Sequence, residues 1–280
     1  MGLEKRTVKI VVVVVVILII LGGLLGLVLG LLLYQRYVEL EVWPRSADDY
    51  RWEQPLIQFR PADPGSWHPW IQRINSFLSA YETTVPEDPA RAPCTIHSRH
   101  EHQNRSPNCD IAMRTWGHCT ADFLYGYPEG KPCVFLRLSH LHYWTPHPYN
   151  VSMNLPIPPE LPDHIKKGLV HQMAQYHDYI WVSCDGEFMA DQENIGPIEY
   201  IPPIEVAPPG FPTNRLHTAD RLPYANRNMP DTDPGPLVAV QFLNPRRGVL
   251  INVECRIWTR DIYYDHTGYT GRARFELFVE

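Results

Sequence analysis

The chain has 280 residues, a formal net charge of −6 at neutral pH, 28 prolines and 6 cysteines. Proline is about twice as frequent as usual, and because it fixes φ and lacks a backbone donor, this argues against a helical bundle and favours a loop-rich or β architecture. The hydrophobic content of 44% excludes wholesale disorder, and the negative charge argues against a nucleic-acid-binding surface.

The first predicted element is an uncharged apolar stretch at residues 10–34. A helix of this length, rising about 1.5 Å per residue, spans the ~30 Å hydrocarbon core of a bilayer. A cleaved secretory signal is the alternative, but its apolar core is only ~7–15 residues long and ends in a small-residue cleavage site. The stretch has no convincing site of that kind, so we predict a transmembrane signal-anchor helix.

The charges beside this stretch predict its orientation. Residues 1–9 contain Lys5, Arg6 and Lys9 against Glu4, and flanks rich in Lys and Arg stay in the cytoplasm. We therefore expect a single-pass type II protein of the plasma membrane. Its predicted parts are a cytoplasmic tail at 1–9, the anchor at 10–34, a juxtamembrane stalk at 35–54 and an extracellular domain at 55–280.

Three glycines recur at four-residue spacing within the predicted span: Gly22, Gly26 and Gly30. On a helix they share one face, which lets a second helix approach closely, as in GxxxG packing. Glycine is also common in membrane spans generally, so both interpretations stay open. The pattern does not say whether a partner helix belongs to another copy or to another protein.

A helix is predicted over residues 66–81. Its apolar side chains recur at helical spacing: Trp70, Ile71, Ile74, Phe77, Leu78 and Tyr81. Ser66 is the expected N-cap, with Pro69 in the first turn, where proline is tolerated. We expect this stripe to pack against the domain rather than a membrane surface. A weaker helical pattern runs through Ile165, Leu169, Met173 and Tyr176.

Five segments are predicted strands: residues 134–138, 179–184, 237–243, 249–258 and 272–279. In the fourth, strict alternation places Val249, Ile251, Val253, Cys255 and Ile257 on one apolar face. The last strand repeats this pattern with Ala273, Phe275, Leu277 and Val279. Proline runs between the strands mark connections. The pattern predicts a mainly β fold, an antiparallel sandwich with a short flanking helix.

The six cysteines all follow the predicted anchor: Cys94, Cys109, Cys119, Cys133, Cys184 and Cys255. An even number on the exoplasmic side indicates disulfides. Zinc is the competing interpretation, but the chain has no CxxC pair. Six cysteines allow 15 pairings. Spacing favours 94 with 109 and 119 with 133 as short loops, which leaves 184 with 255 as a long one.

Two N-glycosylation sequons lie on the same side of the anchor, at Asn104 and Asn150. Both have polar or proline-rich surroundings, as a surface glycan requires. Pro107 directly follows the first sequon, which disfavours its use relative to the second.

The sequence offers little catalytic chemistry. A hydrolase needs a nucleophile, a base and an orienting group within reach of one another, and the chain has no GxSxG, HExxH or paired-carboxylate motif. His97, His100 and His102 could bind a metal, but we favour neutral surface histidines. We therefore expect a protein that is not an enzyme and has no cofactor or metal.

Several motifs together carry a family resemblance. The segment Tyr125–Cys133, followed by an apolar strand, resembles the YGYxxGxPC signature of the β subunits of Na,K-ATPase and H,K-ATPase. Further matching segments are residues 59–64, 181–187, 193–200, 210–212, 236–242 and 253–256. They occur in the family order over roughly residues 55–280, and their amino-acid sequences are most similar to those of insect members.

The resemblance implies a type II glycoprotein whose ectodomain is an immunoglobulin-like antiparallel β-sandwich with long insertions. It implies three sequential disulfides, 94–109, 119–133 and 184–255. It also implies a non-catalytic subunit that folds with a P-type ATPase α subunit, assists its membrane delivery and tunes its cation affinity. ATP hydrolysis and ion transport then belong to the partner.

Two regions depart from the family pattern. The predicted span lacks the FYxxFY-like tyrosines that face the partner's helices in the family. The stretch 213–226 is less aromatic, so Leu222, Pro223 and Tyr224 are its only candidate partner contacts. Two hypotheses follow: a β subunit of a Na⁺/K⁺-exchanging pump, or a pump-independent extracellular adhesion or junction glycoprotein.

Overall fold

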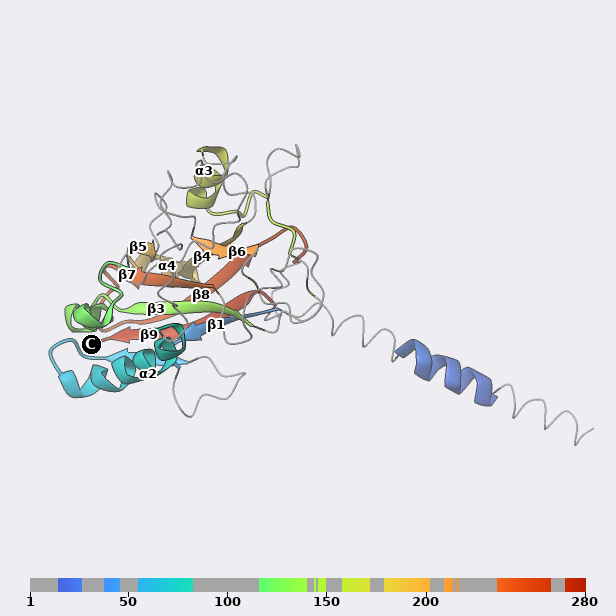
Figure 1. The fold of residues 1–280 in the computed structure, drawn as a ribbon, viewed down its shortest axis with the longest axis horizontal. Helices are drawn as coiled ribbons and strands as arrows, with labels where there is room; N and C mark the ends of the chain where they lie inside the picture. The colour runs from blue at the N-terminus through green and yellow to red at the C-terminus, as the bar shows by residue number, and fades with distance from the viewer. Residues whose placement is uncertain are drawn as a thin grey trace, which may run out of the picture.

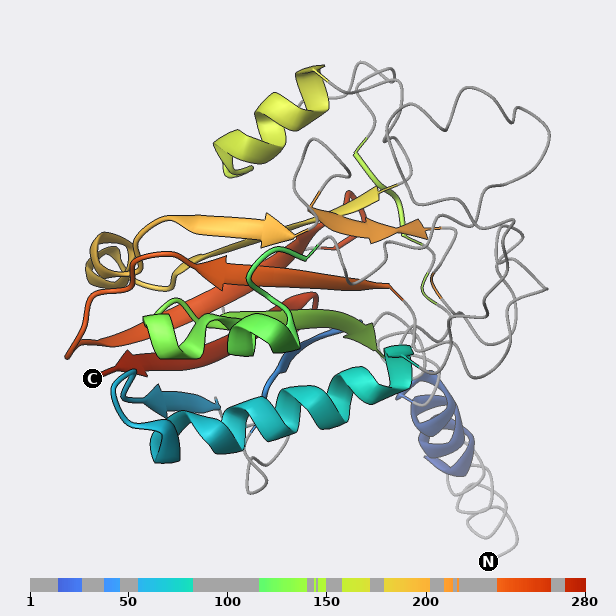
Figure 2. The same ribbon diagram turned by 60° about the vertical axis from the view of Figure 1, so that its left-hand side comes forward.

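The computed structural model describes residues 15–26, 38–45, 55–82, 116–139, 144, 146–149, 158–171, 179–201, 209–213, 216, 236–262 and 270–280. Two β-sheets face each other and enclose an apolar core (Figure 1). The helices α2 (Pro64–Glu82) and η2 (Ala121–Glu129) lie along one side of this sandwich, and α3 (Asp163–His171) lies on the opposite side (Figure 2). The predicted mainly β architecture is therefore confirmed.

One sheet has four strands in the order β1-β3-β7-β5, all antiparallel to their neighbours. They are β1 (Glu39–Trp43), β3 (Cys133–Ser139), β7 (Leu237–Phe242) and β5 (Ile198–Ile201). The strands β3 and β7 are two of those predicted from the sequence. β1 lies within the segment predicted as a stalk, so the sheet begins before residue 55.

The other sheet has five strands in the order β2-β9-β8-β4-β6. They are β2 (Leu56–Phe59), β9 (Arg272–Val279), β8 (Leu250–Trp258), β4 (Tyr179–Gly186) and β6 (Gly210–Pro212). β2 runs parallel to β9, so the prediction of a wholly antiparallel sandwich is wrong at this edge. Only strands joined by a hairpin must be antiparallel, and β2 is far from β9 in sequence.

The core lies between the sheets and is built by alternating side chains. The predicted inward faces are confirmed, because Ile251, Val253, Phe275 and Leu277 are fully buried. The rings of Phe242 and Phe275 meet across the two sheets at 5.9 Å. Burying each such side chain stabilises the fold by about 1.5–3 kcal/mol relative to leaving it exposed.

The helix α2 (Pro64–Glu82) begins two residues earlier than predicted. The Asp63 carboxylate accepts a hydrogen bond from the Gly65 N–H at 3.0 Å, and proline at the first helical position needs no donor. The predicted Ser66 cap is wrong, since the Ser66 hydroxyl bonds the Arg60 backbone instead. The predicted apolar stripe is buried, and Phe77 stacks on Trp43 of β1 at 4.7 Å.

The helix α3 (Asp163–His171) covers the outer face of the five-stranded sheet. Its Ile165 and Leu169 pack on Trp181 of β4 and Trp258 of β8. This confirms the first half of the weaker helical pattern, while Met173 and Tyr176 lie outside the described residues.

His164 of α3 is a half-buried titratable group. Its ring stacks on Tyr200 at 5.0 Å. Burial lowers the pKa of His164, and this outweighs the hydrogen bond to the Val182 backbone and the nearby Asp163 and Asp185 carboxylates, which raise it. The folded protein therefore favours the neutral imidazole.

We expect acid to destabilise the protein through His164. Because the folded-state pKa lies below the unfolded one, this contribution is complete above about pH 6.5 and is lost as the pH falls through the folded pKa. Melting temperatures of the full chain in detergent, measured at pH 7.5 and 5.5, should differ less for His164→Gln than for the wild type. His68→Gln, at an exposed histidine of α2, should keep the wild-type difference in melting temperature. The same difference between the two pH values in all three proteins would contradict this prediction.

Candidate functional site

Two of the three expected disulfides lie among the described residues. Cys119 bonds Cys133, and Cys184 bonds Cys255. Cys94 and Cys109 lie outside the described residues, so their pairing stays a prediction.

Most of the other predicted site residues also lie outside the described part of the chain: Asn104, Asn150, Leu222, Pro223, Tyr224, Gly30, His97, His100 and His102. Gly22 and Gly26 lie in the helical residues 15–26, and nothing lies within 4 Å of a Cβ added at either position. No helix in the described segments has both the length and the apolar character needed to cross a bilayer. The anchor at 10–34 and the glycine face stay predictions.

The Cys119–Cys133 disulfide closes a turn that covers the outer face of β3. This turn contains η2 (Ala121–Glu129), in which Leu124, Tyr125 and Gly126 have positive φ of 49°, 52° and 75°. The Tyr125 hydroxyl donates to the Asn75 side chain of α2 at 2.5 Å, and its ring meets Phe135 edge-on at 5.7 Å. The left-handed backbone is therefore fixed by contacts on two sides.

Gly126 sits where no side chain fits. A Cβ added there would collide with the Lys131 carbonyl oxygen, and it would lie 2.9 Å from the Gln241 side-chain nitrogen. Gln241, which is 1% exposed, donates to that same carbonyl oxygen at 3.0 Å. Tyr127 packs against Phe59 at 4.7 Å, and burial raises the pKa of the Tyr127 phenol. The residues of the YGYxxGxPC signature therefore hold this turn in one fixed conformation.

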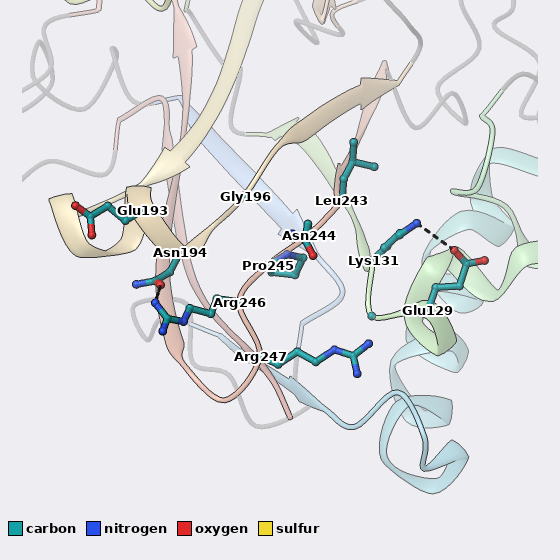
Figure 3. A pocket seen from close by; sticks show the side chains of 11 residues that line it. Glu129, Lys131, Glu193, Asn194, Gly196, Leu243, Asn244, Pro245, Arg246 and Arg247 are labelled. Carbon is teal, nitrogen blue, oxygen red and sulfur yellow. Dashed lines mark hydrogen bonds and ion pairs between the residues drawn. The ribbon is translucent and has the colours of Figure 1, made fainter.

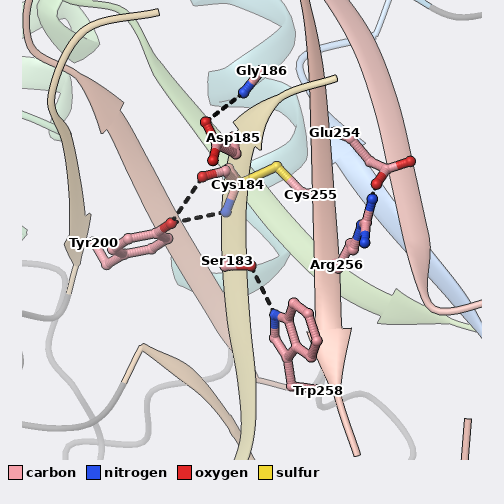
Figure 4. The surroundings of a disulfide bond; sticks show 9 residues. All are labelled: Ser183, Cys184, Asp185, Gly186, Tyr200, Glu254, Cys255, Arg256 and Trp258. Atoms are coloured by element: carbon pink, nitrogen blue, oxygen red, sulfur yellow. Dashed lines mark hydrogen bonds and ion pairs between the residues drawn. A yellow bond between two sulfur atoms is a disulfide. The ribbon is translucent and has the colours of Figure 1, made fainter. Parts of the chain in front are cut away.

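The second disulfide joins two neighbouring strands of one sheet (Figure 4). Cys184 of β4 lies directly opposite Cys255 of β8. The Tyr200 hydroxyl accepts from the Cys184 N–H at 2.8 Å and lies 3.3 Å from its carbonyl oxygen. Since Tyr200 belongs to β5, this contact ties the four-stranded sheet to the five-stranded one.

A buried carboxylate on β8 is held by arginines. Glu254 is 5% exposed; its side chain bonds Arg256, and it accepts from Arg274 at 2.9 Å. Burial raises the pKa of Glu254, but Arg256, Arg274 and Arg272 outweigh this and hold it below its ordinary value. An ionised, fully paired carboxylate cross-links β8 with β9 and is unsuited to general acid catalysis.

The short helix α4 (Met189–Asn194) is anchored by its own buried carboxylate. Asp191 accepts from the Phe188 N–H at 3.2 Å and from the Asn252 N–H of β8 at 3.0 Å. The Asn252 amide lies 3.3–3.4 Å from both carboxylate oxygens. This network fixes the segment that leads from β4 into β5.

A polar hollow of about 480 Å³ opens beside α4 and η2 (Figure 3). Three segments far apart in the sequence line it: residues 129–131, then Glu193, Asn194 and Gly196, and residues 243–247. Lys131 lies 3.7 Å from Glu129, and Arg246 donates to the Asn194 side chain at 3.2 Å. Arg247 points from the β7–β8 turn toward the segment of Glu129 and Lys131 (Figure 3).

The residues that line this hollow were not among the predicted site residues. The available signals were the run Asn244–Gly248, which combines turn residues with two arginines, and the Glu-Gly-Lys within the η2 signature. Within the described ranges, no group of three or more His, Cys, Asp or Glu side chains is placed to hold a metal ion.

Comparison with known proteins identifies the family. Residues 38–275 match the family model described as the sodium/potassium ATPase beta chain. The chain belongs to this family. The matched range includes the signature turn and the two described disulfides.

Individual relatives agree with this assignment. The chain is 34% identical over 235 residues to sodium/potassium-transporting ATPase subunit beta-2 of Drosophila melanogaster, covering 81% of this chain and 67% of the relative. It is 31% identical to subunit beta-1 of the same species, covering 80% and 66%. Human subunit beta-2 is 26% identical, covering 78% and 66%. The chain thus matches about two thirds of each relative's length.

The signature turn should depend on Gly126. We expect Gly126→Ala to lower the free energy of unfolding by ~2–4 kcal/mol, because the methyl group collides with the Lys131 carbonyl in a left-handed backbone. Gly117→Ala is the matched control, since Gly117 also has positive φ but has open space around it; its cost should stay near ~1 kcal/mol. Urea unfolding of the full chain in detergent measures both, and equal losses would contradict the steric argument.

The α4 anchor should depend on Asp191. Asp191→Ala leaves the N–H groups of Phe188 and Asn252 without the carboxylate that accepts from them, so we expect the free energy of unfolding to fall by about 1–3 kcal/mol in the same experiment. Glu193→Ala removes an exposed carboxylate from the same helix and should change stability by no more than ~0.5 kcal/mol. If the urea midpoint of Asp191→Ala equals that of the wild type, the Asp191 network does not stabilise the fold.

Proposed function

We propose that this protein is the non-catalytic β subunit of a P-type Na⁺/K⁺-transporting ATPase. The observation that carries the proposal is the family match over residues 38–275, supported by relatives that are named sodium/potassium-transporting ATPase β subunits. In this role the chain assists folding and membrane delivery of the catalytic α subunit and tunes its cation affinity. ATP hydrolysis and ion movement take place on that partner.

The proposed arrangement is a type II anchor in the plasma membrane with an extracellular sandwich. The apolar stretch 10–34 and the basic residues before it support this topology. The disulfides Cys119–Cys133 and Cys184–Cys255 support an oxidising compartment for the sandwich. The described hydrogen-bond and ion-pair networks serve folding, which agrees with a subunit that supplies binding surface rather than chemistry.

A second candidate function is a pump-independent adhesion or junction glycoprotein on the same fold. Two sequence observations favour it: the absence of the family's FYxxFY-like pattern from 10–34 and the diluted aromatic stretch at 213–226. Both fall where the family meets its α subunit, while the sandwich framework is retained.

Co-expression with a Na,K-ATPase α subunit distinguishes the two functions. We expect the full chain to increase α-subunit delivery to the cell surface and to co-purify with it. A chimera that joins the span of the Drosophila β-2 relative to residues 38–280, which keep β1, is the matched control. An increase with the chimera alone would show that the ectodomain keeps its contact and the native span has lost it. No increase with either protein, together with calcium-independent aggregation of expressing cells, would replace the pump role by the adhesion role.

A further inference from the structure

The polar hollow beside η2 is built by backbone contacts rather than by chance proximity of surface side chains. The Arg246 N–H donates to the Asn194 carbonyl at 2.8 Å, and the Leu243 N–H donates to the Pro197 carbonyl at 2.9 Å. The Phe242 N–H donates to the Pro132 carbonyl at 3.1 Å, which ties the third segment to the same strand end. The lining groups therefore keep fixed positions.

Glycines let these segments approach closely. Gly196 has φ of +70°, and a Cβ there would collide with the Asn244 carbonyl oxygen. A Cβ on Gly130 would lie 3.0 Å from the Arg247 guanidinium. The guanidinium therefore lies close to Gly130, the middle residue of the lining segment 129–131.

The hollow is lined by more positive than negative side chains. Three cationic side chains line it, Lys131, Arg246 and Arg247, against the carboxylates of Glu129 and Glu193. Lys131 is paired with Glu129, and Glu193 points away from the other two segments (Figure 3). Within the part of the chain that the structure describes, Arg247 forms no ion pair. A local positive site thus lies on a chain of net charge −6.

The donor set favours a carboxylate. A guanidinium presents parallel N–H groups that match a carboxylate with two hydrogen bonds, and the exposed Asn244 amide in the same lining can bond a peptide backbone. A densely sulfated glycan fits less well, because Glu129 and Glu193 on the rim repel a continuous polyanion.

We propose that this hollow binds a Glu- or Asp-bearing extended segment of another extracellular protein, with Arg247 as the anchoring residue. The strand directions support access. β1 begins at Glu39, opposite Ser139 of β3, whereas Cys133 at the other end of β3 pairs with Gln241, next to the hollow. The hollow therefore lies at the end of the sandwich remote from the point where the chain enters it. The extracellular setting rests on the proposed topology, but the binding chemistry does not depend on α-subunit assembly.

The test measures peptide binding to the full chain in nanodiscs by fluorescence anisotropy. The probe is a fluorescein-labelled Gly-Ser peptide carrying two glutamates, and its comparison peptide has glutamines instead. We expect the glutamate peptide to bind up to about fivefold more tightly, as one exposed ionic contact allows, and raised salt to weaken it. Arg247→Gln should reduce its affinity to that of the glutamine peptide.

The controls separate the proposal from its alternatives. Arg60→Gln removes an exposed arginine that is already paired with Glu280, so the glutamate peptide should bind as to wild type. Matching melting temperatures show that both variants are folded. Equal binding of the two peptides, or wild-type affinity in Arg247→Gln, overturns the proposal. Arg247-dependent binding of a heparin hexasaccharide without peptide binding would assign the hollow to a glycan instead.

The two proposals can fail independently. Peptide binding by Arg247 in a chain that does not deliver the α subunit would overturn only the pump role. Normal α-subunit delivery by a chain that does not bind the peptide would overturn only the carboxylate site.

Discussion

The fold depends on the burial of strand β3 on both of its faces. Val134 and Leu136 face the five-stranded sheet, while Phe135 and Cys133 face outward, and all four are fully buried. A strand of an antiparallel sandwich ordinarily exposes its outer face to water. Something must therefore cover Phe135, and the chain supplies Trp116 and Tyr125 for this purpose.

This requirement explains the geometry of the η2 turn. To place Tyr125 over Phe135 and return to Cys133 within a few residues, the backbone passes through three left-handed residues. Gly126 permits the closest approach, Gln241 fixes the Lys131 carbonyl, and the disulfide closes the loop. The signature spacing is thus a consequence of covering one apolar strand, and the hollow exists because this turn ends beside the β7–β8 connection.

Much of the framework could be predicted from the sequence, for identifiable reasons. The strands β8 and β9 alternate strictly because one face meets the core, and α2 has a clear apolar stripe because it packs on the sandwich. β1 was missed because Glu39 and Glu41 on its outer face resemble a solvated stalk. Their environment differs, since Arg137 bonds Glu41 at 2.6 Å. Burial raises the pKa of Glu41, and Arg137 and Arg45 offset this, so the pKa is lowered.

The candidate site was harder to predict than the fold because it is assembled from distant segments. No local sequence pattern predicts that Lys131, Asn194 and Arg247 line the same hollow, since their positions depend on the register of β3, β7 and β5. The prediction of the α2 N-cap was wrong for a related reason. Ser66 and Asp63 are both residue types that can cap a helix, but the Ser66 hydroxyl bonds the Arg60 backbone after β2, which leaves Asp63 to accept from the first turn.

The family framework and the departures from it occupy different parts of the chain, and this bears on how such a subunit can diverge. Residues that lock the sandwich, such as Gly126, Asp191 and the β4–β8 cystine, are constrained by burial and by fixed backbone geometry. In the predicted span, the described residues 15–26 are exposed and carry no such contacts, whereas Leu216 of the 213–226 stretch is buried in the core. A change of partner can therefore proceed through the span and loops while the sandwich stays intact. By the same reasoning, an exposed arginine such as Arg247 can acquire a ligand without any cost to folding.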